Sequence, residues 1–106
     1  MKCYAVAEVT VTDRGWVKDY IQKVTPMVEA HGGRYLARTN KVEKLEGERA
    51  LPHTFLILEF PSREAARGFY ESPEYRPFRE ARLAGSIGDF VLVQGEDASG
   101  VARVAD

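Results

Sequence analysis

The run HTFLILEF, residues 53–60, most constrains the fold, because it reads as a strand with two apolar faces. Successive side chains of a strand point to opposite faces of the sheet. One set of alternate residues comprises Leu56, Leu58 and Phe60, and the other comprises Phe55, Ile57 and Glu59, with His53 on the same parity. We expect the first set to lie under helices. The second set is too apolar to face water, so the other face of the sheet must also be covered.

Residues 2–11, KCYAVAEVTV, have the same two-residue period and predict the first strand. The odd-numbered set is apolar and mostly small: Cys3, Ala5, Ala7, Val9 and Val11. We assign this set to the face that the helices cover. The even-numbered set then lies on the opposite face and comprises Tyr4, Val6, Glu8 and Thr10.

A helix is predicted to follow the first strand, because apolar residues recur at helical spacing after Asp13. Thr12 or Asp13 offers an N-cap, and Pro26 is expected to kink or split the helix. The stretch HGGRYLAR, residues 31–38, then reads as the joint between this helix and a second strand. His31 suits the last helical turn, and one of the two glycines after it suits a left-handed C-cap.

The remaining segments supply the other elements of the domain. KVEKLEGE at 41–48 predicts a hairpin arm or edge strand, and Pro61 with Ser62 begins a second helix. A third short helix is expected over roughly 77–84, and DFVLVQG at 89–95 is the last strand. The order is strand, helix, strand, strand, helix, strand. It predicts a ferredoxin-like α+β subunit, with a four-stranded antiparallel sheet and helices on one face.

The uncovered face of that sheet predicts a partner. It would carry Tyr4, Val6, Leu36, Phe55 and Ile57, which together are too apolar for water. We expect it to be buried against the same face of a second copy, giving a homodimeric α+β barrel formed by residues 1–95. Residues 96–106 are polar and are predicted to be a flexible tail or an arm that reaches the partner chain.

Composition excludes several kinds of partner and site. A formal net charge of −1 argues against nucleic-acid binding, which requires a basic excess or a basic face. No apolar stretch approaches the roughly 18 residues of a membrane span, and no signal peptide is expected. The single cysteine, Cys3, allows no internal disulfide and no paired-cysteine zinc site, which favours a cytoplasmic setting. Two histidines without a carboxylate at ligand spacing predict no metal site, and we expect no cofactor.

Several stretches together resemble a known family. They are MKCYAVAEVTVTD, HGGRYLAR followed by LEG at 45–47, LEFPSREAARGFYESPEYRP at 58–77 and the terminal DFVLVQG. Over about residues 2–95 they are similar to the conserved family called domain of unknown function 1330. The resemblance implies membership of the dimeric α+β barrel superfamily, and hence a ferredoxin-like fold and a dimer. That superfamily includes cofactor-free monooxygenases, small isomerases and decarboxylases, and haem-binding enzymes, so the resemblance implies no single activity.

Arg38 is the most informative candidate for a site, because a guanidinium inside the barrel needs an anionic partner. Glu8 or Glu59 would provide one, and the resulting ion pair would fix the sheet or the dimer. Alternatively, Arg38 binds a substrate carboxylate or enolate while one of these glutamates, its pKa raised by burial or by the other carboxylate, acts as base. His53 is a further candidate acid or base, although an exposed histidine at the start of a strand explains it equally well.

Aromatic residues supply the other candidates for substrate binding. Trp16 and Tyr20 lie four residues apart on one helical face, where Tyr20 also suits the core and Trp16 a cavity mouth or an interface. Tyr4 lies on the open face with Arg38. We expect a small organic molecule to bind within the barrel or between sheet and helices, with the chemistry of a cofactor-independent isomerase or monooxygenase. The alternative is a non-catalytic ligand-binding or dimerisation module, and an open polar pocket around Arg38 would favour the enzyme.

Overall fold

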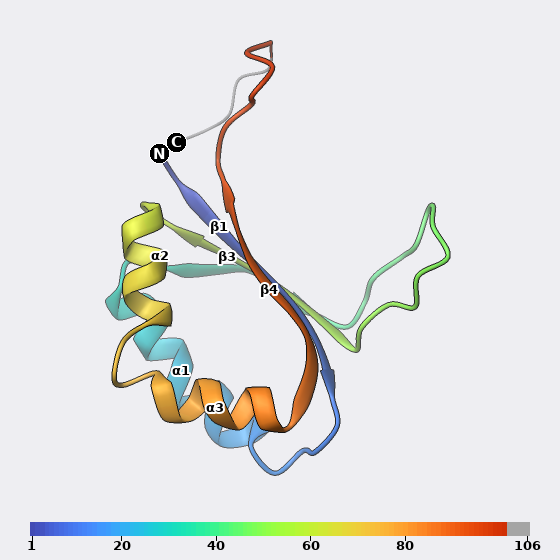
Figure 1. Cartoon of the computed structure of the whole chain (residues 1–106), viewed down its shortest axis with the longest axis vertical. Coiled ribbons are helices and arrows are strands. Elements are labelled where there is room, and N and C mark those ends of the chain that lie inside the picture. Colours follow the sequence, from blue (N-terminus) through green and yellow to red (C-terminus); the bar gives the residue numbers. More distant parts are fainter. Residues whose placement is uncertain (102–106) are drawn as a thin grey trace.

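The structure, a computed structural model, describes residues 1–101. The elements in chain order are β1 (Cys3–Val11), α1 (Val17–Ala30), β2 (Arg34–Thr39), β3 (Thr54–Phe60), α2 (Arg63–Tyr70), α3 (Arg76–Ala84) and β4 (Ser86–Gln94). The strands form one antiparallel sheet in the order β2-β3-β1-β4, and all three helices lie on the same face of it (Figure 1). The predicted ferredoxin-like α+β subunit is therefore confirmed.

The core lies between the helices and the two central strands. The odd-numbered residues of β1 from Cys3 to Val9 are buried, and so are Leu58 and Phe60 of β3. The helices contribute Val24 and Val28 from α1 and Ala66 and Phe69 from α2. The alternation predicted for both central strands is confirmed, and the small side chains of β1 leave room between the sheet and α1.

Helix α1 begins later than expected and is not interrupted. The carboxylate of Asp13 accepts a hydrogen bond from the Gly15 backbone N–H at 2.9 Å, so it orders the preceding turn rather than the helix, which starts at Val17. Pro26 lies inside the helix on its exposed side. The carbonyl group that lacks a partner because of this proline belongs to Gln22, which is also exposed, so water can satisfy it. The predicted split of the helix at Pro26 is therefore wrong, and the predicted kink stays a prediction.

The stretch HGGRYLAR forms the joint between α1 and β2. Gly32 has φ +78°, and the Gly33 N–H donates to the Val28 carbonyl at 2.9 Å, which ends the helix in a left-handed cap. His31 turns its ring back onto the helix, with Nδ1 3.0 Å from the Met27 carbonyl oxygen. These residues serve chain reversal, as expected.

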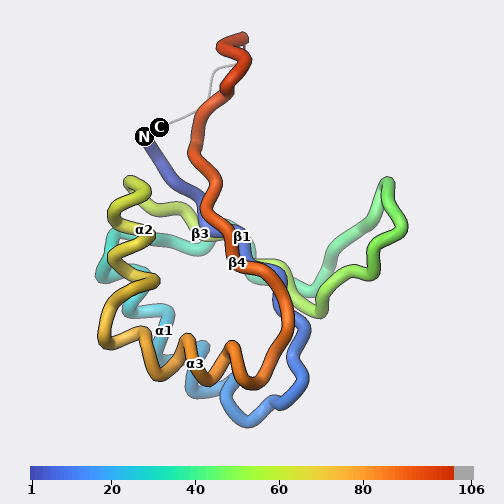
Figure 2. The backbone as a smooth tube through the Cα atoms, in the orientation of Figure 1, coloured from blue at the N-terminus to red at the C-terminus, as the bar shows by residue number. Residues whose placement is uncertain are grey.

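Residues 40–53 form an arm that reaches away from the sheet (Figure 2). Of the two alternatives predicted for 41–48, the edge strand is wrong, because the segment pairs with no neighbouring strand and Leu45 is 84% exposed, and the segment forms an arm. The arm is tied to the sheet by an ion pair of 2.6 Å between Arg49 Nη1 and Glu8 Oε1. Residues 96–101 contain only bends and turns beyond β4, and the rest of the predicted tail, residues 102–106, lies outside the described residues.

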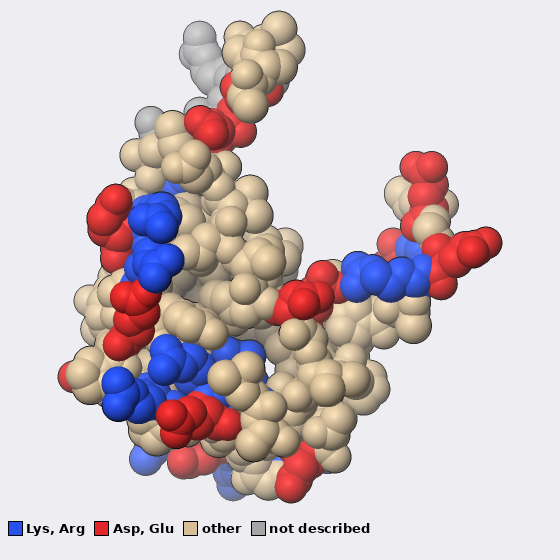
Figure 3. Space-filling view, in the orientation of Figure 1, with Lys and Arg blue, Asp and Glu red and all other residues tan. Residues whose placement is uncertain are grey.

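The sheet surface opposite the helices, called the open face below, has no covering element within residues 1–101 (Figure 1). Cross-strand partners share a face, and the register places Val93 beside Tyr4 and Val91 beside Val6. The open face therefore carries Tyr4, Val6, Leu36, Phe55, Ile57, Val91 and Val93. Figure 3 shows charged side chains over α2 and along the arm, with a largely uncharged surface between the arm and β4. No helix among the described residues is long and apolar enough to cross a membrane.

Candidate functional site

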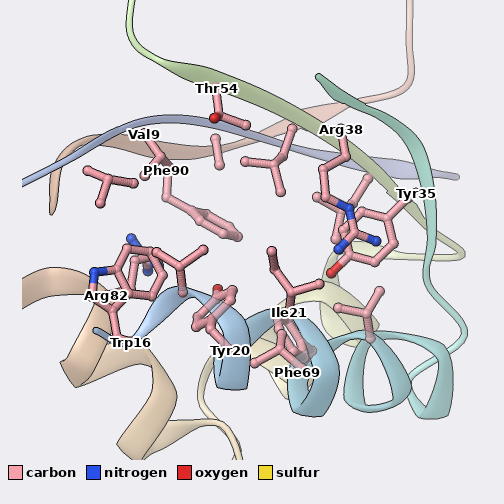
Figure 4. A pocket seen from close by; sticks show the side chains of 17 residues that line it. Val9, Trp16, Tyr20, Ile21, Tyr35, Arg38, Thr54, Phe69, Arg82 and Phe90 are labelled. Carbon is pink, nitrogen blue, oxygen red and sulfur yellow. The ribbon is translucent and has the colours of Figure 1, made fainter. Parts of the chain in front are cut away.

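A cavity of about 110 Å³ lies between the helix-covered face of the sheet and α1 (Figure 4). Its existence follows from the small side chains of the central strand, because Ala7 and Val9 leave space beneath the large rings of Trp16 and Tyr20. Leu56, Leu58, Val24 and Phe90 supply further apolar wall. The cavity is accordingly lined mainly by carbon, with a few polar groups that point into it, as small-molecule sites usually are.

Arg82 of α3 is the most unusual residue of this lining. It is only 7% exposed, and its Nε and Nη2 atoms are buried without a hydrogen-bond partner. No ion pair within residues 1–101 includes Arg82, and its Cζ lies 5.4 Å from the centre of the Phe90 ring. An arginine stays charged in proteins, and a buried charge without a partner is costly. The cavity thus contains a cation with free donors and no anion to neutralise it.

Two tyrosine hydroxyl groups adjoin this guanidinium. Tyr20 and Tyr75 are joined by a hydrogen bond of 2.5 Å between their hydroxyl oxygens. Both favour the charged form of Arg82, but they leave its Nε and Nη2 atoms without a hydrogen-bond partner. Burial, reinforced by the neighbouring Tyr75, raises the pKa of Tyr20 far above its ordinary value. Tyr20 therefore remains protonated at neutral pH, and because one of the two hydroxyl groups donates to the other, a single O–H is left to donate to a ligand. Together these groups can stabilise an oxyanion.

Arg38 reaches the same cavity from the other side, because β2 contains a bulge. Tyr35 pairs with Leu58 and Ala37 pairs with the next residue of β3, Ile57, so Leu36 is the extra residue. Beyond the bulge the alternation is reversed, and Arg38 lies opposite the buried-face residue Leu56. The expectation that Arg38 lies on the open face is wrong for this reason. Its guanidinium stacks over Tyr35, with Cζ 3.9 Å from the ring centre.

The candidate carboxylates lie on the other side of the sheet, so the structure does not bring them together with Arg38. Glu59 contacts Lys2 Nζ at 3.1 Å and Arg34 Nη2 at 3.4 Å. The hydrogen bond from Lys2 is the main reason that the pKa of Glu59 is lowered. Glu8 pairs with Arg49 of the arm. Both carboxylates thus make structural ion pairs on the open face.

The other predicted site residues divide between the two faces. Trp16 and Tyr20 line the cavity, as Figure 4 shows. Tyr4 is half-buried on the open face. His53 is exposed just before β3, where its backbone N–H lies 3.4 Å from Thr10 Oγ1. The described residues contain no cluster of three or more His, Cys, Asp or Glu side chains that could hold a metal ion.

Sequence reasoning missed Arg82, Tyr75, Tyr35 and Phe90. For Arg82 a signal was present: Tyr75, Phe78 and Arg82 stand at positions i, i+3 and i+7, which is the spacing of a buried helical stripe. An arginine in such a stripe lies on the face that the helix turns toward the core. The cavity lining contains two arginines but no Asp, Glu or His. Its own side chains can therefore bind and stabilise an anion, but none is suited to act as a general base near neutral pH.

Proteins of known structure share this architecture. A protein of unknown function from Rhodopseudomonas palustris superposes with a TM-score of 0.72 at 18% identity, covering 91% of this chain and 83% of that one. SnoaB, a cofactor-independent oxygenase from Streptomyces nogalater, gives 0.62 at 15% identity, covering 93% and 97%. An antibiotic biosynthesis monooxygenase gives 0.57 at 15% identity, covering 92% and 100%. At these identities the likeness shows the fold alone.

Sequence comparison identifies the family. A search of curated proteins finds no match to this chain. A family model described as Domain of unknown function (DUF1330) matches residues 2–96. That match contains all the helices and strands described above, together with the cavity between them. The chain therefore belongs to the DUF1330 family.

Proposed function

We propose that the protein binds a small, mainly apolar organic anion in the cavity between α1 and the sheet, with Arg82 as the anion's partner. The unpartnered, buried guanidinium of Arg82 is the observation that carries this proposal. A ligand oxyanion that accepts hydrogen bonds from the Nε–H and Nη2–H groups of Arg82 would remove the free-energy cost of burying this charge without an anionic partner. Tyr20, which lines the cavity, would complete the anion's surroundings with its O–H group, while the Tyr75 O–H would donate to the Tyr20 oxygen.

The ligand class follows from the same groups. A carboxylate, an enolate or a phenolate suits the guanidinium, and an aromatic or branched aliphatic body suits the apolar walls. An engineered apolar cavity of about 150 Å³ holds a benzene ring, and the present cavity of about 110 Å³ also opens to solvent beside the exposed Ile21 and Arg38. Because the lining contains no base, the acidity must belong to the ligand itself. Arg82 would favour the ionised form.

A reaction on that anion is the second candidate function. Oxygenation without a cofactor requires a substrate that gives electrons to O₂ itself, and an enolate or phenolate is such a substrate. The fold likeness to a cofactor-independent oxygenase supports this class of reaction. An isomerase is less well supported, because the lining has no residue to move a proton. Oxygen consumption with a bound phenol separates the oxygenase from a protein that only binds.

The binding proposal can be tested with 4-nitrophenol, whose ionised form absorbs visible light. Binding to the wild type should lower the probe's apparent pKa by about one unit or more, because the guanidinium stabilises the phenolate. Arg82→Met keeps the length of the side chain and removes its charge, so the shift should disappear. The fluorescence of Trp16, the single tryptophan, reports occupancy independently.

Two controls make this test specific. Arg76→Met removes an exposed arginine from the same helix outside the cavity and should leave the pKa shift intact. Nitrobenzene, which has no ionisable group, should bind the wild type and Arg82→Met with similar affinity. If the three proteins ionise bound 4-nitrophenol equally, Arg82 is not the anion partner and the proposal is wrong.

We further propose that the protein is a homodimer joined through its open face. A compact monomer of this mass exposes roughly 5,950 Å², whereas this chain exposes 7153 Å². The arm contributes to this additional exposed area. The additional area is larger than the roughly 800 Å² that each partner buries in a standard interface. The apolar open face supports the same assembly. The free, buried Cys3 supports a reducing, cytoplasmic location, which cell fractionation would test.

A further inference from the structure

We infer that the ligand carries two anionic groups, one at each end of an apolar body, with Arg82 holding the inner group and Arg38 the outer group. This inference rests on the binding function proposed above and names the substrate class of the same cavity. The class comprises small aromatic or branched aliphatic dianions, such as hydroxyaryl carboxylates, keto acids in their enolate form and dicarboxylates. A monoanion would use only half of the charge that the cavity presents.

The first observation is the charge balance of the lining. Two of its residues are cationic and none is anionic. Apolar walls of low dielectric strengthen the field of such charges and attract ligands of the opposite sign. Neutralising both cations takes two negative charges, and the lining itself supplies none.

The second observation is how weakly Arg38 is held by its own chain. No ion pair within residues 1–101 includes it, and its contact with Thr25 Oγ1 measures 3.4 Å, which is longer than an ordinary hydrogen bond. The Tyr35 ring fixes one face of the guanidinium by stacking. Stacking leaves the in-plane N–H donors available. Arg38 is therefore held in position while its N–H groups can still donate to a ligand. By contrast, Arg34 and Arg49 on the other face each pair with a glutamate.

The third observation is the placement of the two arginines. They lie on opposite sides of the cavity, with Tyr20 and Ile21 between them (Figure 4). Arg82 is buried, whereas Arg38 is exposed. The ligand therefore has an inner anionic end in a dry environment and an outer end at the solvent boundary. An elongated molecule with charges at both ends fits this arrangement, and a compact dianion does not.

A matched pair of probes tests this inference. 2-Nitrophenol and 4-hydroxy-3-nitrobenzoate have the same nitrophenol ring, and the second adds a carboxylate opposite the hydroxyl group. The wild type should bind the second probe about five- to tenfold more tightly, the gain expected of one charged contact that is partly exposed. Arg38→Met should abolish this preference, because it should weaken the binding of 4-hydroxy-3-nitrobenzoate much more than that of 2-nitrophenol. Arg82→Met should weaken the binding of both probes.

Arg76→Met again controls for the loss of one positive charge and should retain the wild-type preference. Raising the ionic strength should reduce the wild type's preference for 4-hydroxy-3-nitrobenzoate, because salt screens the contact between its carboxylate and the exposed Arg38. If both probes bind the wild type with equal affinity, or Arg38→Met retains the preference, the inference is wrong and the single-anion function stands. If neither probe binds the wild type, the binding function fails as well.

Discussion

Gly85 sets the position of Trp16, and with it the end wall of the cavity. A Cβ atom at residue 85 would lie 2.3 Å from both Cδ1 and Nε1 of the indole, closer than any side chain permits. The indole Nε1–H donates to the Gly85 carbonyl at 3.0 Å. Gly85 has φ −107°, which any residue can adopt, so the requirement for glycine is one of space. One missing side chain thus decides where the large ring can lie.

Gly85→Ala should therefore displace Trp16 from the cavity wall. We expect a destabilisation of about 1–3 kcal/mol, as for other overpacked sites, and a shift of the tryptophan emission to longer wavelength. Urea unfolding followed by fluorescence measures both effects. Gly68→Ala in α2 is the matched control, because its added methyl group would make only an ordinary contact, 3.6 Å from His31 Cδ2, and should leave stability equal or slightly higher. Unchanged emission in Gly85→Ala would show that the indole is not held by this contact.

At the scale of elements, alternation along a strand predicted the fold well but predicted the site poorly. Strand β1 is regular, and every residue expected under the helices from Cys3 to Val9 is buried there. Strand β2 carries no glycine or proline to mark its bulge, so the reversal after Leu36 could not be predicted. That reversal separates Arg38 from both glutamates. Only the contacts between strands reveal which face a charged residue occupies after an irregularity.

Helix α3 gives the complementary case. Its boundaries followed from local signals, namely the proline at 77 and the glycine at 85. The role of its arginine did not, because the space beneath Arg82 depends on side chains from α1 and β1 that are distant in sequence. A cavity is a property of several elements together. The sequence alone therefore indicates the candidate residues more readily than the site that they form.

Glu59 joins three strands, since it lies in β3 and contacts Lys2 before β1 and Arg34 of β2. Its lowered pKa means that these contacts stabilise the fold above the ordinary carboxyl pKa and are lost as pH falls through the folded-state value. Glu59→Gln should therefore be less stable than the wild type at neutral pH, and this difference should shrink in acid. Urea midpoints from about pH 7 down to pH 3 measure it. Glu80→Gln, which removes an exposed carboxylate of α3, is the control and should show no such trend. If the stability difference between Glu59→Gln and the wild type does not change with pH, the contacts of Glu59 do not stabilise the fold in this way.

At the scale of the whole molecule, the chain is expanded for its size. Its radius of gyration is 14.6 Å, against roughly 12.9 Å expected for a compact domain of this length. The arm and the segment after β4 project away from the helices (Figure 1), and the sheet between them is uncovered. A single subunit would leave the open face exposed to water. The proposed second copy would cover it, and would account for the expansion and for the apolar open face together.

Val91→Asp should therefore convert the proposed dimer to single subunits. Val91 is 50% exposed in one chain and lies on the open face beside Val6, so each dimer would bury two carboxylates there. Leu83→Asp places the same charge on α3, where Leu83 is 57% exposed, and should leave the dimer intact. Sedimentation equilibrium at micromolar concentration should give twice the chain mass of 11.9 kDa for the wild type and one chain mass for Val91→Asp. A wild type that sediments as a single chain would disprove the assembly.

The absence of acids and histidines from the cavity lining has a practical consequence for identifying the natural ligand. Arginine and buried tyrosine keep their charge states between about pH 5 and pH 9. Any change of affinity across that interval, apart from changes in the fold as a whole, must come from protons gained or lost by the ligand. A titration of binding against pH would thus record the ligand's own acidity, and so narrow the choice among unidentified metabolites before any of them is purified.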